Sequence, residues 1–500
     1  MIRILNLLII YFFCSTIILF AQIGEQVTLN NDEGNNCNVE EQERTVVTDH
    51  IITINGKDVP YKAKTGTLFV YNEKDEPIGS FFYIAYMRSD IDNKDTRPIT
   101  FAYNGGPGSA SLWLHMGAIG PKRVITGDTY QAPGPPYTLV ENEYTLLDVS
   151  DLVFIDPIGT GYSHALGCED PKQFWGYMND IASVSEFIRR FVTENNRWKS
   201  PKYLLGESYG TMRSAGVANY LQNYEGMYLN GIVFISTVLD YKTISFDEGN
   251  DLPYILFLPT YATTALYHNR IVNPYDSLET FLKEVRSFSV NEYSGALFKG
   301  VFLEQNMKEE IITKLSEFTG ISKDFIRKGN IRIKDYEFRK ELLRDYGLIT
   351  GRYDSRILGY AENINSSFPE GDPSSWVIDG AFNAAIKSYL SEELGYEEKR
   401  TYVTGGGVVW DFPENEYLNF SGELRTAMVR NLVLKSFFAN GYYDLATPFF
   451  ATEYTVAHLG LPKDILNRIT FKYYKAGHMM YTNLDSLKKL KGDLLNFYNN

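Results

Sequence analysis

The chain contains the stretch Tyr203-Leu204-Leu205-Gly206-Glu207-Ser208-Tyr209-Gly210, in which a short apolar run is followed by the motif G-x-S-x-G. The apolar run predicts a strand, and residues 212–221 behind it predict a helix. Glycines on both sides of Ser208 permit the tight strand-to-helix turn that lifts a serine hydroxyl clear of the backbone. The motif occurs once in the chain, and its setting predicts that Ser208 is a nucleophile.

Similar apolar runs occur on either side of this stretch. Residues 98–103, 152–155 and 231–235 are short and apolar, and the first two end in glycine-rich loops. Residues 181–191 between them have apolar positions at helical spacing. Strands that alternate with helices predict a doubly wound, mostly parallel sheet, in which functional residues collect beyond the carboxyl ends of the strands. We therefore expect an α/β-hydrolase fold.

The predicted sheet is interrupted by a long segment of a different character. Residues 240–399 are rich in charged helical stretches and Gly/Asp breaks, which predicts an insertion that caps the sheet. The core of the fold is then expected in two parts, residues 45–239 and residues 400–500.

The N-terminus has the pattern of a secretory signal peptide. Residues 1–3 carry one arginine, residues 7–20 are almost wholly apolar, and a small residue, Ala21, precedes Gln22. Residues 1–21 are therefore expected to be removed from a secreted or periplasmic protein, and an uncleaved anchor is the alternative. Residues 22–44 are polar and predict a flexible lead-in.

Two cysteines remain after the predicted cleavage, Cys37 and Cys168. They would form one disulfide in an oxidising compartment. Two free thiols are an equally good interpretation, because one bridge adds little to a chain of 500 residues.

Composition argues against several kinds of partner. The formal net charge is −14, and no cluster of Lys and Arg stands out, which argues against binding to nucleic acid or to anionic membranes. The six histidines are scattered and show no paired ligand spacing, so we expect no metal site. Nothing in the sequence indicates a cofactor.

A serine nucleophile needs a histidine base and a carboxylate that fixes the tautomer of that histidine. In this fold the acid and then the histidine follow the serine along the chain, where the histidines are His268, His458 and His478. His478 comes directly after a predicted strand, as does Asp444, whereas His268 lies in the insertion and His458 on a predicted helix. The predicted triad is therefore Ser208, Asp444 and His478.

An oxyanion hole needs two backbone N–H groups directed at the developing alkoxide. One is expected from Tyr209, which follows the nucleophile. The other is expected from Gly106 in the loop Asn104-Gly105-Gly106-Pro107-Gly108. A phosphate-binding loop is a weaker interpretation, because no Lys-Ser/Thr pair follows the glycines.

Several loops together resemble the serine carboxypeptidase family, peptidase family S10, over most of the chain. The matching stretches, in chain order, are Asn104-Gly105-Gly106-Pro107-Gly108-Ser109, Gly120-Pro121, Asp156-Pro157 with Gly159-Thr160-Gly161-Tyr162-Ser163, Gly206-Glu207-Ser208-Tyr209-Gly210, Asn440-Gly441-Tyr442-Tyr443-Asp444 with Pro448, and Ala476-Gly477-His478-Met479. The resemblance implies release of C-terminal residues from peptides through an acyl-enzyme, and it implies that Asn104 and Glu207 bind the terminal carboxylate. Glu207 would have to be protonated for this role, which a buried carboxyl group can be, so an acidic activity optimum is implied.

One position departs from the family pattern. Ala118 stands where family members commonly have a second glutamate, which shares a proton with the glutamate of the G-x-S-x-G motif, here Glu207. Without that partner Glu207 is expected to ionise more readily. We expect compensation from His115, Lys122 or Arg123, unless all three are surface residues. Ser109 also replaces a common family cysteine, so the usual disulfides are not assumed.

Two other functions use the same residues. An esterase or acyltransferase needs the same triad with a different pocket, and a binding protein could retain the fold without catalysis. The sequence leaves open the side-chain preference at the scissile bond and the oligomeric state.

Overall fold

A computed structural model describes residue 39 and residues 41–126, 134–272 and 275–499. The predicted signal peptide and most of the predicted lead-in lie outside the described residues. Within those ranges, no helix has the length and apolar character needed to span a membrane. Cys168 is disulfide-bonded, whereas Cys37 is not described, so their pairing stays a prediction.

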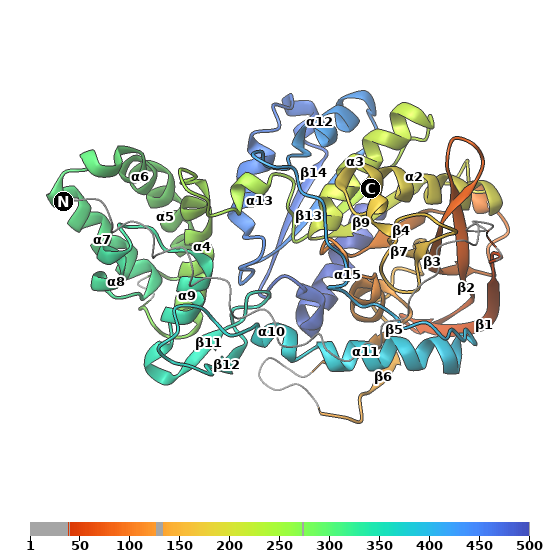
Figure 1. Ribbon diagram of the computed structural model, residues 1–500, viewed down its shortest axis with the longest axis horizontal. Coiled ribbons are helices and arrows are strands. Elements are labelled where there is room, and N and C mark those ends of the chain that lie inside the picture. Colours follow the sequence, from red (N-terminus) through yellow and green to blue (C-terminus); the bar gives the residue numbers. More distant parts are fainter. Residues whose placement is uncertain (1–38, 40, 127–133, 273–274, 500) are drawn as a thin grey trace, which may run out of the picture. The chain divides into compact units, whose positions relative to one another are not determined.

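A ten-stranded sheet forms the centre of the fold (Figure 1). Its strands, in spatial order, are β1 (Thr45–Ile54), β2 (Lys57–Tyr71), β3 (Pro77–Arg88), β7 (Asp151–Asp156), β4 (Ile99–Tyr103), β9 (Lys202–Glu207), β10 (Gly231–Ile235), β13 (Lys435–Gly441) and β14 (Ile469–Tyr474), with β8 (His164–Ala165) paired to β3. Neighbouring strands from β1 to β7 are antiparallel, and those from β7 to β14 are parallel. The predicted mostly parallel sheet is confirmed.

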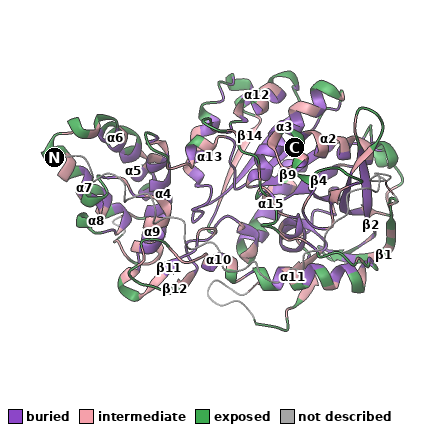
Figure 2. Cartoon of the chain, viewed as in Figure 1, coloured by how far each residue is buried: buried purple, intermediate pink, exposed green. Residues whose placement is uncertain are grey.

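The central strands are buried on both faces of the sheet, and successive side chains of a strand point to opposite faces. In β7, Leu152 and Phe154 join one hydrophobic cluster, and Val153 and Ile155 join the other. Figure 2 shows the buried residues concentrated along these strands and the inner sides of the helices. This pattern explains why the strands read as continuous apolar runs.

Helices cover each face. One face carries α2 (Tyr177–Glu194), α3 (Tyr209–Tyr224) and α12 (Ser421–Arg430), and the other carries α1 (Leu112–Leu114), the single turn η2 (His115–Ile119), α11 (Asp379–Ser388) and α15 (Leu484–Asn499). Two shorter helices, α13 (Phe449–Ala457) and α14 (Lys463–Leu466), connect β13 to β14. This is the two-layer covering expected of a doubly wound sheet.

The segment between β10 and β13 includes the residues for which a cap was predicted. Its first helices are α4 (Leu252–Tyr267), α5 (Leu278–Phe288), α6 (Ser294–Lys299), α7 (Gln305–Thr319), α8 (Lys323–Lys328) and α9 (Asp335–Glu341). They share a hydrophobic cluster of their own, which also takes in Leu445 from the loop after β13. The hairpin β11 (Leu348–Thr350) with β12 (Leu358–Tyr360) and the helix α10 (Pro373–Trp376) lead from this cluster to α11, which packs on the sheet. The hairpin β5 (Lys122–Val124) with β6 (Leu139–Glu141) lies outside the main sheet.

Candidate active site

Ser208 occupies a strained turn between β9 and α3. Its φ is 58° and its ψ is −127°, a region that residues other than glycine rarely adopt. The backbone N–H of Ser208 donates to the carbonyl of Ile235 at 3.0 Å, which fixes the turn to the neighbouring strand. A Cβ at Gly206 would overlap the carbonyl oxygen of Gly210, so this turn requires glycine. The structure therefore has the predicted elbow geometry.

Asp444 and His478 meet beyond the carboxyl ends of β13 and β14. Asp444 Oδ2 lies 2.8 Å from His478 Nδ1. The other oxygen of Asp444 accepts the backbone N–H groups of Ala446 at 2.8 Å and Thr447 at 2.9 Å. An ionised Asp444 can only accept, so Nδ1 of His478 carries the proton and Nε2 is left as a base.

The same contact controls the charge of His478. Burial disfavours the protonated ring, but the charge and the hydrogen bond of Asp444 outweigh it and raise the pKa of His478 above its ordinary value. The charge of Glu207 raises it further, and the positive charge of Arg352 lowers it. His478 is thus suited to accept a proton from a nucleophile near neutral pH.

The other two histidines downstream of Ser208 have different surroundings. His458 ends α13 as an exposed residue, with Nδ1 2.7 Å from the carbonyl of Tyr454. His268 ends α4, with Nε2 2.7 Å from the carbonyl of Ser355. Neither of these two histidines lines the cavity that contains His478. The histidine that meets Asp444 is therefore the one predicted from the sequence.

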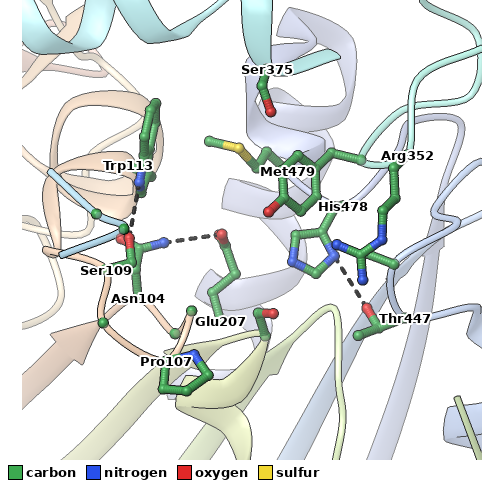
Figure 3. A pocket seen from close by; sticks show the side chains of 18 of the residues that line it. Asn104, Pro107, Ser109, Trp113, Glu207, Arg352, Ser375, Thr447, His478 and Met479 are labelled. Atoms are coloured by element: carbon green, nitrogen blue, oxygen red, sulfur yellow. Dashed lines mark hydrogen bonds between the residues drawn. The ribbon is translucent and has the colours of Figure 1, made fainter. Parts of the chain in front are cut away.

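Ser208 and His478 line one cavity of about 580 Å³ (Figure 3). The 104–109 loop and Trp113 form one wall, and the segment Arg352-Tyr353 together with Thr447 forms another. Further residues that line it are Val238, Tyr241, Ile244, Ser375, Ile378, Asp379, Asn383 and Met479. The volume is that of a small-molecule or short-peptide site.

The 104–109 loop lies directly against the turn between β9 and α3 that carries Ser208. A Cβ at Gly105 would lie 2.5 Å from the amide nitrogen of Tyr209, so only glycine permits this approach. Gly106, next to it, has a φ of 99°. The N–H of Tyr209 is in the first turn of α3, where it has no partner within the helix. Gly106 therefore follows directly on the glycine that contacts Tyr209, the other predicted oxyanion-hole residue.

A buried ion pair holds these two loops in place. Arg213 Nε lies 2.7 Å from Asp180 Oδ2, and Arg213 Nη1 donates to the carbonyl of Asn104 at 2.8 Å. The hydroxyl of Tyr209 donates to the same Asp180 oxygen at 3.0 Å. Asp180 and Arg213 were not predicted as site residues, because both lie within ordinary helical patterns.

Asn104 and Glu207 form a polar pair in the cavity wall. Asn104 Oδ1 accepts the N–H of Leu114 at 3.0 Å, so its amide Nδ2 faces Glu207 and donates to Oε1 at 3.0 Å. Burial raises the pKa of Glu207 to about 7, although His478, Tyr481 and Asn104 each stabilise the ionised form. Glu207 is thus largely protonated in mildly acidic solution.

The three side chains expected to compensate for Ala118 lie outside the active cavity. His115 lies in the core, where its ring contacts the Tyr86 hydroxyl at 2.6 Å and burial lowers its pKa to about 3. Lys122 pairs with Glu393 at 3.1 Å. His115, Lys122 and Arg123 are not among the described residues that line the cavity. The expectation was wrong for His115, because η2 directs this residue away from the cavity, into the core.

A segment of the insertion that was not predicted to take part in the site contacts the loop that carries His478. The carbonyl of Tyr353 accepts the N–H of His478 at 2.6 Å, and its ring lies 5.2 Å from the imidazole. Asp354 Oδ2 accepts the N–H of Gly477 at 3.0 Å and pairs with Arg356 at 2.6 Å. No motif in residues 351–356 indicates this role, since it depends on tertiary contacts.

Comparison with known proteins gives consistent results. The sequence model of the family described as serine carboxypeptidase matches residues 55–485. Serine carboxypeptidase-like 50 of Arabidopsis thaliana is 26% identical over 355 residues, which is 69% of this chain and 69% of that protein. Vitellogenic carboxypeptidase of Aedes aegypti is 28% identical over 125 residues, 24% of this chain and 23% of that protein.

Among solved structures, Kex1(delta)p, a prohormone-processing carboxypeptidase from Saccharomyces cerevisiae, superimposes with a TM-score of 0.55. The match covers 88% of this chain and 91% of that chain at 16% sequence identity. At this identity the likeness concerns the fold, which is the α/β-hydrolase fold.

Proposed function

This chain belongs to the serine carboxypeptidase family, and on that premise we propose that Ser208, His478 and Asp444 carry its chemistry. The enzyme is a serine-type carboxypeptidase that acts on peptides. The observation that supports the triad most directly is the 2.8 Å contact between Asp444 and His478 in the cavity that Ser208 lines.

The proposed reaction has two halves. Ser208 Oγ attacks the scissile carbonyl carbon while His478 Nε2 takes its proton, and the N–H groups of Gly106 and Tyr209 donate to the oxyanion. The C–N bond then breaks as His478 returns the proton to the departing amine, which leaves an acyl-enzyme. Water, deprotonated by His478, attacks this ester; the C–Oγ bond breaks as His478 returns the proton to Ser208 Oγ, which releases the shortened peptide. Each oxyanion donor contributes about 10²- to 10³-fold.

We also propose that Asn104 and Glu207 bind the C-terminal carboxylate of the substrate. A carboxylate is recognised by donors, and an ionised Glu207 would repel it, so Glu207 must be protonated. Because burial raises the pKa of Glu207 to about 7, this form is present below neutral pH and lost above it. Asn104 supplies a second donor from the same wall of the cavity.

The pH dependence of substrate selection tests this proposal. For an N-blocked dipeptide acid and its C-terminal amide, we expect the ratio of kcat/KM values to favour the acid below pH 7. The ratio should then fall about tenfold per pH unit as Glu207 ionises. The amide serves as the internal control, because the titration of His478 affects both substrates. Equal cleavage of acid and amide between pH 4 and 8 would contradict the carboxylate site and favour an esterase or acyltransferase.

Two further features remain proposals. We propose that residues 1–21 direct export, so that the enzyme acts as a secreted or periplasmic protein. The proposed division into residues 45–239, 240–399 and 400–500 is supported in part by the separate hydrophobic cluster of helices α4 to α9.

A further inference from the structure

Tyr481 lies in the single turn η9 (Met480–Thr482), close behind the histidine loop. Its side chain is 2% exposed, and a Cβ at Gly117 would lie 2.8 Å from its ring. Gly117 precedes Ala118, the position where a second acid was expected. The hydroxyl of Tyr481 is adjacent to Glu207 and to Asn104, so the wall behind Glu207 contains a phenol.

Two buried polar atoms at this place lack a hydrogen bond of good geometry to any described residue: Glu207 Oε2 and Tyr481 Oη. The large majority of buried polar groups have partners, and an unpaired one is costly. Asn104 already occupies the other oxygen, Oε1. The remaining partners for Oε2 are therefore the Tyr481 hydroxyl on one side and a ligand in the cavity on the other.

Resting on the proposed carboxylate site, we propose that Tyr481 is a positioning residue whose hydroxyl fixes Oε2 of Glu207 for binding to the C-terminal carboxylate of the substrate. With Oε1 held by Asn104, the acidic proton of Glu207 resides on Oε2. In the free enzyme the hydroxyl of Tyr481 faces Glu207 and stabilises its ionised form. When substrate binds, the proton is donated to the carboxylate, and Tyr481 donates its own proton to Oε2.

A phenol suits this place because it both donates and accepts. Burial raises the pKa of Tyr481 well above its usual range, so it stays neutral and does not repel Glu207. The titratable groups that face Glu207 are His478, Tyr481, Tyr353 and, more distantly, Asp444. Of the two phenols only Tyr481 is placed to share a hydrogen bond with Glu207, so its loss changes that bonding without changing the charge of the site.

The test is the pH profile of Tyr481→Phe with the dipeptide acid and its amide. Loss of the hydroxyl removes a donor that stabilises the ionised form of Glu207. The fall in the acid-to-amide ratio should therefore move to higher pH by about one unit. Since Glu207 is also less well oriented, KM for the acid should rise about tenfold at pH 5.5, with little change for the amide.

Tyr498→Phe is the matched control, because Tyr498 is a buried tyrosine whose hydroxyl bonds Thr100 at 2.7 Å, away from the cavity. It should leave the pH profile unchanged. An unshifted profile in Tyr481→Phe, with normal discrimination in the wild type, overturns the role of Tyr481. Absence of discrimination in the wild type instead overturns the carboxylate site itself. Retained cleavage of the amide shows that the variant is folded.

Arg352 provides a second, independent observation. Its side chain lines the active cavity, and Glu207 and Arg352 approach His478 from opposite sides (Figure 3). The backbone of Arg352 is fixed, since its N–H donates to Asp372 Oδ1 at 2.8 Å and its carbonyl accepts the N–H of Leu445 at 2.9 Å. The fixed backbone thus anchors a cationic side chain at the cavity wall beside the general base.

No described carboxylate forms an ion pair with the guanidinium of Arg352. Asp372, which binds its backbone, lies 3.9 Å from Arg339 instead. The guanidinium carbon of Arg352 lies 5.7 Å from the centre of the Tyr353 ring. A half-buried guanidinium without a counter-ion attracts an anion from the ligand.

We infer that Arg352 forms a subsite for an acidic side chain on the acyl side of the scissile bond. This again rests on the proposed carboxylate site. If the leaving residue is held by its carboxylate at Glu207, the acyl chain extends past His478 toward Arg352. A glutamate at that position would supply the missing counter-ion, whereas a glutamine would not.

The test compares N-blocked Glu-Leu with N-blocked Gln-Leu, which differ only in charge on the acyl side. The wild type should favour Glu-Leu by about fivefold to tenfold in kcat/KM, and the preference should weaken as salt is added. In Arg352→Met the ratio should fall to one or below. Failure of Ser208-dependent cleavage for both peptides would contradict the proposed function rather than the subsite.

Two results would overturn the subsite. One is an unchanged Glu-to-Gln ratio in Arg352→Met. The other is loss of the preference for a C-terminal acid over its amide in the same variant, which would mean that Arg352 binds the terminal carboxylate. Arg352→Lys is the conservative variant. It should keep part of the preference for Glu-Leu, because lysine keeps the positive charge but lacks the planar guanidinium group.

Discussion

Replacing Ser208 with alanine should lower kcat for an N-blocked dipeptide by about six orders of magnitude. The hydroxyl is the atom that forms the acyl-enzyme, and His478 alone has no nucleophile to activate. Alanine is small and replaces the side chain without new contacts at the φ of 58° that Ser208 adopts. The measurement is single-turnover hydrolysis at pH 6, followed until the background rate is reached.

A fluorophosphonate probe gives the control for this variant. The wild type should be labelled at one serine, and Ser208→Ala should not be labelled. Dipeptide binding without turnover would show that the cavity is intact in the variant. Residual hydrolysis within a hundredfold of the wild type would contradict the assignment of Ser208 and would also remove the basis for an acyl-enzyme.

Most of the fold was predictable because chain order and strand polarity constrain it. The apolar runs at residues 98–103, 152–155, 203–205 and 231–235 became β4, β7, β9 and β10, and parallel strands bring their carboxyl ends to one edge. It can therefore be predicted, without any knowledge of side-chain contacts, that the loops that follow these strands meet. Asp444 and His478 could be selected in the same way, since each follows a strand.

Strand limits were less predictable. The apolar run at residues 432–439 predicts a strand from its first residue, but β13 begins at Lys435. Leu432 and Val433 are 75% and 64% exposed. They belong to the turn that joins α12 to β13, and hydrophobicity alone does not separate a strand from an exposed apolar turn.

Residues that act through tertiary contacts were not predictable. Tyr481 and Arg352 belong to no motif, and their positions beside Glu207 and His478 depend on how the insertion and η9 pack. The mistaken assignment of His115 has the same origin. A sequence shows that an acid is missing at Ala118, but it does not show which neighbour in space occupies the place.

Replacing Asp444 with asparagine should lower kcat by about four orders of magnitude. Oδ1 of Asp444 accepts two backbone N–H groups, from Ala446 and Thr447, so the carbonyl oxygen of an asparagine must take that place. Its NH₂ group then faces His478 Nδ1. Because a donor now faces Nδ1, the proton of the imidazole moves to Nε2, and the ring can no longer accept a proton from Ser208.

The acid limb of the pH profile provides a second readout for Asp444→Asn. In the wild type the charge of Asp444 raises the pKa of His478, so activity is lost as pH falls through that raised value. Without the charge, burial dominates, and the limb should move to lower pH in the residual activity.

Thr447→Val is the matched control for Asp444→Asn. The Thr447 hydroxyl donates to Asp444 Oδ2 at 2.8 Å, but its loss leaves the charge and the tautomer of His478 intact. We expect a fall in kcat of about tenfold at most. If Asp444→Asn lost no more activity than Thr447→Val, Asp444 would act only by packing, and another group would have to orient His478.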